Sequence, residues 1–149
     1  KLLKHFRNYQ MVTRKPKSYW LGALLVHHIR EGNVDTTQPL AVLFRDLLKA
    51  IYSQYAGLLG YDDGRTPNIP DPMLGHNISW NWSRSHFGTF MRRVKEGRDR
   101  ATEALSTDDR AEAVSLWQEV FGKSYFPTDV SEAALEHAAV WYLMWFPSP

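Results

Sequence analysis

The chain of 149 residues contains no cysteine. Thiolate metal sites, cysteine nucleophiles and disulfides are therefore excluded, and the absence fits a reducing compartment, so we expect a cytoplasmic protein. A long hydrophobic run is also lacking. The longest apolar stretches, Leu21–Ile29 and Ala138–Phe146, are too short or too interrupted for the roughly 20 residues that a membrane span needs. We therefore expect no membrane partner.

Acidic residues are absent from the first thirty positions, although the net charge of the whole chain is only +2. The bases of this segment are Lys1, Lys4, Arg7, Arg14, Lys15, Lys17 and Arg30. A second basic run, with only two acids among it, comprises Arg84, Arg92, Arg93, Lys95, Arg98 and Arg100. This asymmetry favours an anionic ligand at the N-terminal face, because the local field is positive whatever the total. The alternative is a solvated surface with ordinary scatter of charge.

The sequence shows no convincing alternation of apolar and polar residues, so strands are not expected. Apolar residues instead recur every three or four positions, which predicts an all-α bundle of about five to six helices in one domain. The expected helices lie near residues 1–10, 18–31, 39–56, 83–105, 107–121 and 131–145. Ser18 and Ser83 are predicted N-caps, and Gly32 and Gly122 are predicted to end helices.

A long connection, from Tyr61 to Trp82, has no periodicity of its own and should form an ordered loop. It contains Ile69-Pro70-Asp71-Pro72, followed by Gly75-His76-Asn77. Asp71 and Asn77 can bond to nearby peptide groups, so a structural role is favoured for them.

The start of the second helix is suited to holding a polyphosphate. Free backbone N–H groups and the positive end of the helix dipole attract anions. If the first two helices pack antiparallel, Lys4 can reach the same place as Ser18, and Tyr19 can offer its ring to a base.

Four features, taken in order, resemble the helical C-terminal half of nucleotidyltransferases related to oligoadenylate synthase and cyclic GMP-AMP synthase, and most closely the bacterial CD-NTases. These features are Leu2-Leu3-Lys4, Lys17-Ser18-Tyr19, the loop from Ile69 to Asn77, and the segment from Ala113 to Phe121-Gly122-Lys123. The resemblance implies that Lys4 and Ser18, with Lys17 beside them, bind the triphosphate of a donor nucleotide. It also implies that Tyr19 stacks on the base.

The catalytic part of that family is absent from this sequence. It is a mixed α/β half with a Gly-Ser turn and three carboxylates that hold two divalent metals, whereas this chain has no Gly-Ser dipeptide and no Asp-x-Asp pair. We therefore expect an α/β catalytic domain upstream of residue 1, with Mg²⁺ or Mn²⁺ and nucleoside triphosphates, and no catalytic residue here. The expected role is to position substrates in an enzyme that makes cyclic or linear oligonucleotide second messengers, as in antiviral defence.

Other functions stay open at this stage. A non-enzymatic module could bind nucleic acid through the basic N-terminal face, with Arg14, Lys15, Arg92 and Arg93 as phosphate contacts. A partner-docking module is a third class, suggested by the aromatic ending Trp141, Tyr142, Trp145 and Phe146. No metal site is expected, because the neighbours His27 and His28 point about 100° apart on a helix.

Overall fold

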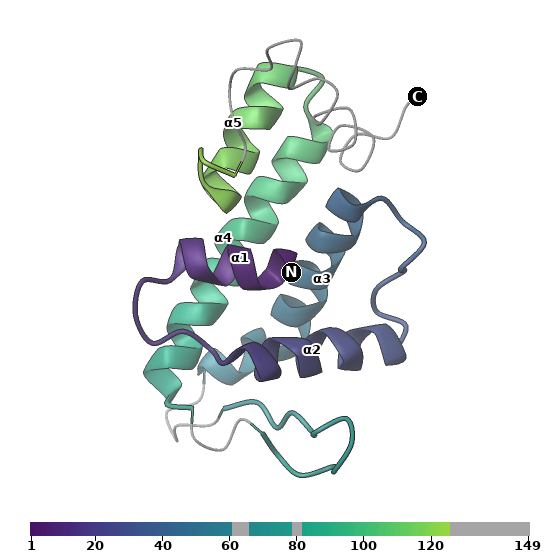
Figure 1. Ribbon diagram of the computed structural model, residues 1–149, viewed down its shortest axis with the longest axis vertical. Helices are drawn as coiled ribbons and strands as arrows, with labels where there is room; N and C mark the ends of the chain where they lie inside the picture. Colours follow the sequence, from purple (N-terminus) through teal and green to yellow (C-terminus); the bar gives the residue numbers. More distant parts are fainter. Residues whose placement is uncertain (61–65, 79–81, 126–149) are drawn as a thin grey trace.

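The computed structural model describes residues 1–60, 66–78 and 82–125 (Figure 1). Its elements, in order, are α1 (Leu2–Gln10), α2 (Ser18–Arg30), α3 (Leu40–Tyr55), the short 3-10 helix η1 (Ala56–Gly60), α4 (Arg84–Ser106) and α5 (Arg110–Phe121). Within these residues there is no strand, only an isolated antiparallel bridge between Pro70 and Asn77. The all-α prediction is confirmed. The helix expected at 131–145 lies outside the described residues.

The core forms where α3 and α5 pack on the long helix α4. Large side chains from every one of the five helices are buried there, because each helix carries an apolar face at the three- and four-residue spacing read in the sequence. The Phe44 ring lies 5.6 Å from that of Phe6 and 4.9 Å from that of Phe121, measured between centroids. Aromatic contacts therefore join α1, α3 and α5.

Helix α1 is hydrogen-bonded to the C-terminal end of α5. The His5 Nε2 atom lies 2.8 Å from the carbonyl of Phe121, and the Gln10 amide donates to the carbonyls of Glu119 and Val120 at 2.7 and 2.9 Å. The last carbonyls of a helix have no partner within it, so these bonds satisfy the end of α5. On its other side, α1 approaches α4 at Gly97. A Cβ atom there would lie 2.6 Å from the Phe6 ring.

Several predicted helix ends are confirmed. Ser83 caps α4, accepting a hydrogen bond from the His86 N–H at 3.3 Å, and Gly122 follows α5 with a φ of 90°. After α2, Gly32 has a φ of 69°, and the N–H of Asn33 reaches the carbonyl of His28 at 2.9 Å. This is the Schellman pattern, in which a left-handed residue redirects the chain and satisfies terminal carbonyls.

The predicted N-cap of α2 is wrong by one residue. Lys17 is the cap, with extended backbone at φ −61° and ψ 148°, and Ser18 is the first helical residue. The Ser18 hydroxyl is engaged instead by Arg7, and no side chain of the described residues caps the first turn. Pro16 keeps Lys15 before it out of the helical region, so α2 cannot begin earlier in the chain.

No helix in the described part of the chain is both long and apolar enough to cross a bilayer.

Candidate functional site

Arg7 joins α1 to the start of α2. Its Nη1 atom donates to the carbonyl of Pro16 at 2.6 Å and to the Ser18 hydroxyl at 3.2 Å, while Nε and Nη2 donate to the side-chain oxygen of Asn8. Each of these acceptors is uncharged. The positive charge of the guanidinium therefore has no carboxylate among these acceptors, and it lies at the N-terminus of α2, where the helix dipole already favours an anion.

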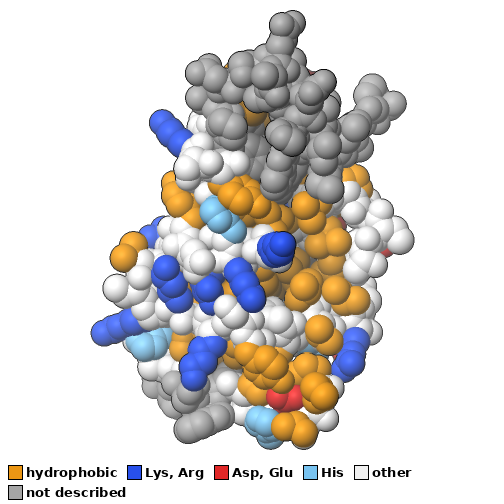
Figure 2. Space-filling model, viewed as in Figure 1, with side chains coloured by type: hydrophobic (Ala, Val, Ile, Leu, Met, Phe, Trp, Pro, Cys, Tyr) orange, Lys and Arg blue, Asp and Glu red, His pale blue; other side chains and the backbone are white. Residues whose placement is uncertain are grey.

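Lys4 precedes Arg7 by three positions on α1, so the two side chains are neighbours on the helix surface. Lys4 is exposed, and its side chain has no hydrogen bond or ion pair with the described residues. Figure 1 shows α1 and α2 running in opposite directions on one side of the molecule, and Figure 2 shows Lys and Arg side chains gathered over this region. The structure thus places Lys4 one helical turn from the contact between Arg7 and Ser18. We refer to Lys4, Arg7, Ser18 and Tyr19 as the α1–α2 junction.

Tyr19 lies on the first turn of α2, and 56% of its surface is exposed. Its hydroxyl donates a hydrogen bond to the carboxylate of Asp71, in the loop between η1 and α4. This contact is the main cause of the lowered pKa of Asp71, with backbone N–H groups of Leu74 and Met73 adding to it. The same hydrogen bond, with burial, raises the pKa of Tyr19. The ring is thus held at its tip while its body faces solvent.

The predicted structural role of Asp71 and Asn77 is confirmed. The Asp71 Oδ1 atom accepts from the N–H groups of Met73 and Leu74 at 2.7 and 2.8 Å, and Asn77 Oδ1 accepts from the Ile69 N–H at 3.2 Å. These bonds replace regular secondary structure in a segment whose prolines prevent it.

Arg14, Lys15 and Lys17 surround a second feature, a groove of about 230 Å³ between the start of α2 and the start of α4. Its lining residues are Arg14, Lys15, Pro16, Lys17, Trp20, Ile78, Trp82 and His86. The three cations are exposed, and the Trp20 and Trp82 rings meet edge to face with centroids 4.3 Å apart. Arg14 has a φ of 55°, a left-handed conformation that is unusual for a residue with a side chain. We call this feature the basic groove.

The other predicted phosphate contacts lie on α4 and are paired. Arg93 contacts Glu96 at 2.7 Å, and Arg92 contacts the same carboxylate at 3.5 Å. Arg93 lines a cavity with Tyr9 and Gln10 of α1, and that lining includes none of the junction residues. The pairing of both arginines favours the interpretation of α4 as an ordinary charged face.

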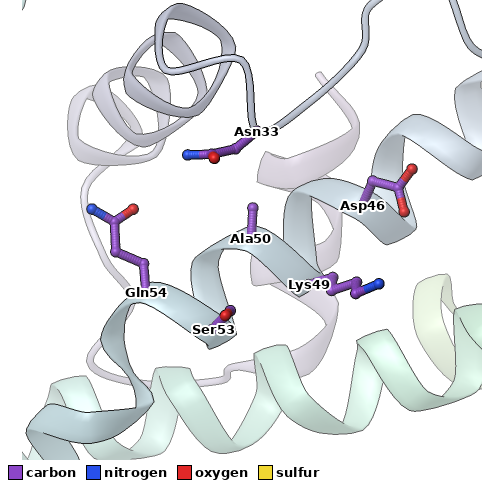
Figure 3. Close-up of a pocket in the computed structure, with 6 residues that line it drawn as sticks. All are labelled: Asn33, Asp46, Lys49, Ala50, Ser53 and Gln54. Carbon is purple, nitrogen blue, oxygen red and sulfur yellow. The ribbon is translucent and has the colours of Figure 1, made fainter.

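A larger pocket, of about 430 Å³, lies between α3 and the loop after α2 (Figure 3). It is lined by Asn33, Asp46, Lys49, Ala50, Ser53 and Gln54. Figure 3 shows Asp46 and Lys49 on the part of α3 that lies at the other end of the pocket from Gln54. Because Asp46 and Lys49 carry opposite charges, the lining of this pocket has no net charge that would favour an anion.

Among the described residues, no group of three or more His, Asp or Glu side chains could hold a metal ion. His27 lies 3.1 Å from the Gln54 amide, while His28 is fully buried and burial lowers its pKa to about 4. These residues therefore do not fit the divalent ions that the family resemblance implies for catalysis.

No protein-family model matches the chain. The sequence is similar to a cyclic AMP-AMP-AMP synthase from Acinetobacter sp., with 29% identity over 142 residues, or 93% of this chain. This similarity supports a CD-NTase-like relationship at low identity. The chain spans 39% of the length of that relative.

Sequence reasoning missed two residues of this region. The sequence marks Arg7 only as one base among seven, and local bonding indicates only a role within its own loop for Asp71. Helical spacing from Lys4 would have placed Arg7 on the same face, so a signal existed for it. The contact between Tyr19 and Asp71 spans 52 positions, and no local pattern could have indicated it.

Proposed function

We propose that this chain is the helical substrate-positioning part of a nucleotidyltransferase that makes cyclic or linear oligonucleotide second messengers from nucleoside triphosphates. The observation that supports it is the α1–α2 junction, where Lys4 and Arg7 lie at an uncapped helix start and the exposed Tyr19 ring follows directly. The similarity to a cyclic AMP-AMP-AMP synthase supports the same class of reaction.

In this proposal the chain contributes position and charge. Lys4, Arg7 and the first N–H groups of α2 would bind the triphosphate, and Tyr19 would stack on the base. Fixing the leaving phosphates restrains the α-phosphorus for attack by a nucleotide hydroxyl and stabilises the charge that develops on pyrophosphate. Divalent metals would belong to an upstream α/β catalytic domain, and we assign no step to them in this chain.

The test is calorimetric titration of the intact protein with ATP, AMP and tripolyphosphate. A site built around a triphosphate should bind ATP at least tenfold more tightly than AMP, because two further phosphates engage the cations. Tripolyphosphate should compete with ATP. Equal affinity for ATP and AMP would contradict the proposal.

The basic groove favours a second candidate function, the binding of nucleic acid by a non-enzymatic module. Exposed cations beside the partly exposed Trp82 ring suit a phosphate backbone with a base stacked against that ring, whereas Trp20 is buried. Such binding should strengthen with the length of the oligonucleotide and fall steeply with salt. Filter binding of oligonucleotides of increasing length, at two salt concentrations, distinguishes this function from a site that takes one triphosphate.

A further inference from the structure

The contact between Tyr19 and Asp71 joins two very different environments. Tyr19 is 56% exposed, whereas Asp71 is only 6% exposed. An exposed tyrosine ordinarily rotates among several side-chain conformations. Here the hydroxyl is anchored to a buried carboxylate, so the ring has a fixed direction although solvent surrounds most of it.

Asp71 is itself held firmly. Its Oδ1 atom accepts from the N–H groups of Met73 and Leu74, and its own N–H donates to the carbonyl of His76 at 2.8 Å. Oδ2 is left for the Tyr19 hydroxyl. One oxygen therefore shapes the loop, while the other reaches α2. The arrangement transmits the rigidity of the loop to the exposed ring.

We infer that Asp71 is a positioning residue, which orients the Tyr19 ring as the platform for the base of a bound nucleoside triphosphate. This inference rests on the proposed function. A ring already fixed in the free protein loses little freedom when a base stacks on it, so orientation contributes to affinity without a new contact to the ligand. Asp71 would act on the base end of the nucleotide alone, because the triphosphate end lies with Lys4 and Arg7.

The competing explanation is a purely structural link between the loop and α2. That link would affect stability and would leave the discrimination between ATP and tripolyphosphate untouched. The ratio of these two affinities therefore separates the explanations, because only ATP carries a base.

The experiment measures the affinities of the intact protein for ATP and for tripolyphosphate in the variants Tyr19→Phe, Tyr19→Ala and Asp71→Asn. Tyr19→Ala removes the platform and should weaken ATP binding about 5- to 100-fold, the range for stacking of a base on an aromatic ring. Tyr19→Phe keeps the ring but loses the hydrogen bond to Asp71. Because ATP binding must then order a mobile ring, the affinity for ATP should weaken about 2- to 10-fold. Tripolyphosphate affinity should stay within about twofold in each variant.

Asp71→Asn keeps an oxygen for the loop amides and removes the charge that the Tyr19 hydroxyl meets. It should weaken ATP binding no more than Tyr19→Phe does, and combining the two changes should add nothing, because both act through one hydrogen bond. Tyr52→Phe, which removes a hydroxyl from α3, is the matched control and should leave ATP affinity unchanged.

Wild-type ATP affinity in Tyr19→Phe, with only a lower melting temperature, would overturn the inference and leave the proposed function standing. Equal loss of ATP and tripolyphosphate affinity would also overturn it, because the whole junction would then have been disturbed. A wild-type protein that binds neither ligand would reject the proposed function, and the inference with it.

Discussion

The N-terminal bases and the bases of α4 look alike in the sequence but differ in their surroundings. On α4, Arg93 pairs with Glu96, Lys95 pairs with Asp99 at 3.2 Å, and Arg100 lies 2.6 Å from Glu119. The first thirty residues contain no acid, Arg7 bonds to neutral oxygens, and the Asp71 carboxylate that reaches the junction accepts from the Tyr19 hydroxyl rather than from a base. A run of bases therefore indicates an anion site only when carboxylates are missing at helical spacing.

The largest expected effect is a loss of stability at low pH, caused by His28. It limits the pH range in which anion binding at the two regions can be compared. His28 is fully buried, and burial, with a smaller contribution from His27, lowers its pKa from 6.5 to about 4. Between these values the unfolded chain takes up a proton and the folded chain does not. The free energy of unfolding should therefore fall as pH decreases from 6.5 towards 4, by up to about 3 kcal/mol.

Urea denaturation between pH 7 and pH 4 measures this dependence. His28→Leu should flatten it, whereas His27→Gln should preserve most of it. An unchanged slope in His28→Leu would assign the acid sensitivity to other groups. Anion binding should accordingly be compared above pH 6.5.

The second prediction compares the two basic regions directly. Lys4→Ala should weaken ATP binding to the intact protein by about 1 to 3 kcal/mol, the usual range for a hydrogen bond to a charged group. Arg92→Ala should change it by less than about 0.5 kcal/mol, because that arginine is exposed and already pairs with Glu96. Calorimetric titration of both variants checks the contrast. Equal losses would remove the distinction between the regions.

The third prediction concerns the contact between α1 and α4, the helices that carry bases of the two regions. The two helices meet at Gly97 and Phe6. Gly97→Ala would press a methyl group into the Phe6 ring and should destabilise the fold by about 1 to 3 kcal/mol. Gly88→Ala, on the same helix, has open space around it and should stabilise by about 0.5 to 1 kcal/mol. Thermal or urea denaturation gives both values. A neutral Gly97→Ala would show that α1 can shift away from α4.

The smallest expected effect tests whether ion pairs with Glu96 prevent Arg92 and Arg93 from binding anions. Glu96→Gln removes the carboxylate from Arg92 and Arg93 and should alter stability by no more than about 0.5 kcal/mol, as for other exposed pairs. Its affinity for tripolyphosphate, measured in a Lys4→Ala background, should rise slightly at low salt. No rise would mean that shape, rather than pairing, keeps anions from this face.

Much of the fold followed from periodicity, because burial of apolar faces at helical spacing dominates an all-helical domain. The positions of α1 to α5 and the roles of Ser83, Gly32 and Asp71 in local bonds were within reach of such patterns. The cap of α2 was missed by one position, because a serine after Pro16-Lys17 can either cap a helix or begin it. Its hydroxyl bonds to Arg7, and that choice depends on the neighbouring helix.

The candidate site was less accessible to prediction. Lys4, Ser18 and Tyr19 are indicated both by the helix start and by the resemblance, and their ligand is still a prediction. The pairing of Tyr19 with Asp71 and the meeting of Arg14, Lys15 and Lys17 with Trp82 depend on tertiary packing. The spacing of residues along the sequence does not predict such contacts.

The fastening of α1 onto the end of α5 has a consequence for how the protein is made. His5 and Gln10 bond to carbonyls more than one hundred positions downstream, so these bonds cannot form while the ribosome is still synthesising the middle of the chain, although Phe6 can already pack on Phe44. The full set of contacts that hold α1 would be completed only once residue 121 has emerged. A product that stops before residue 119 would contain every residue of the junction but none of the carbonyls that hold α1 to α5.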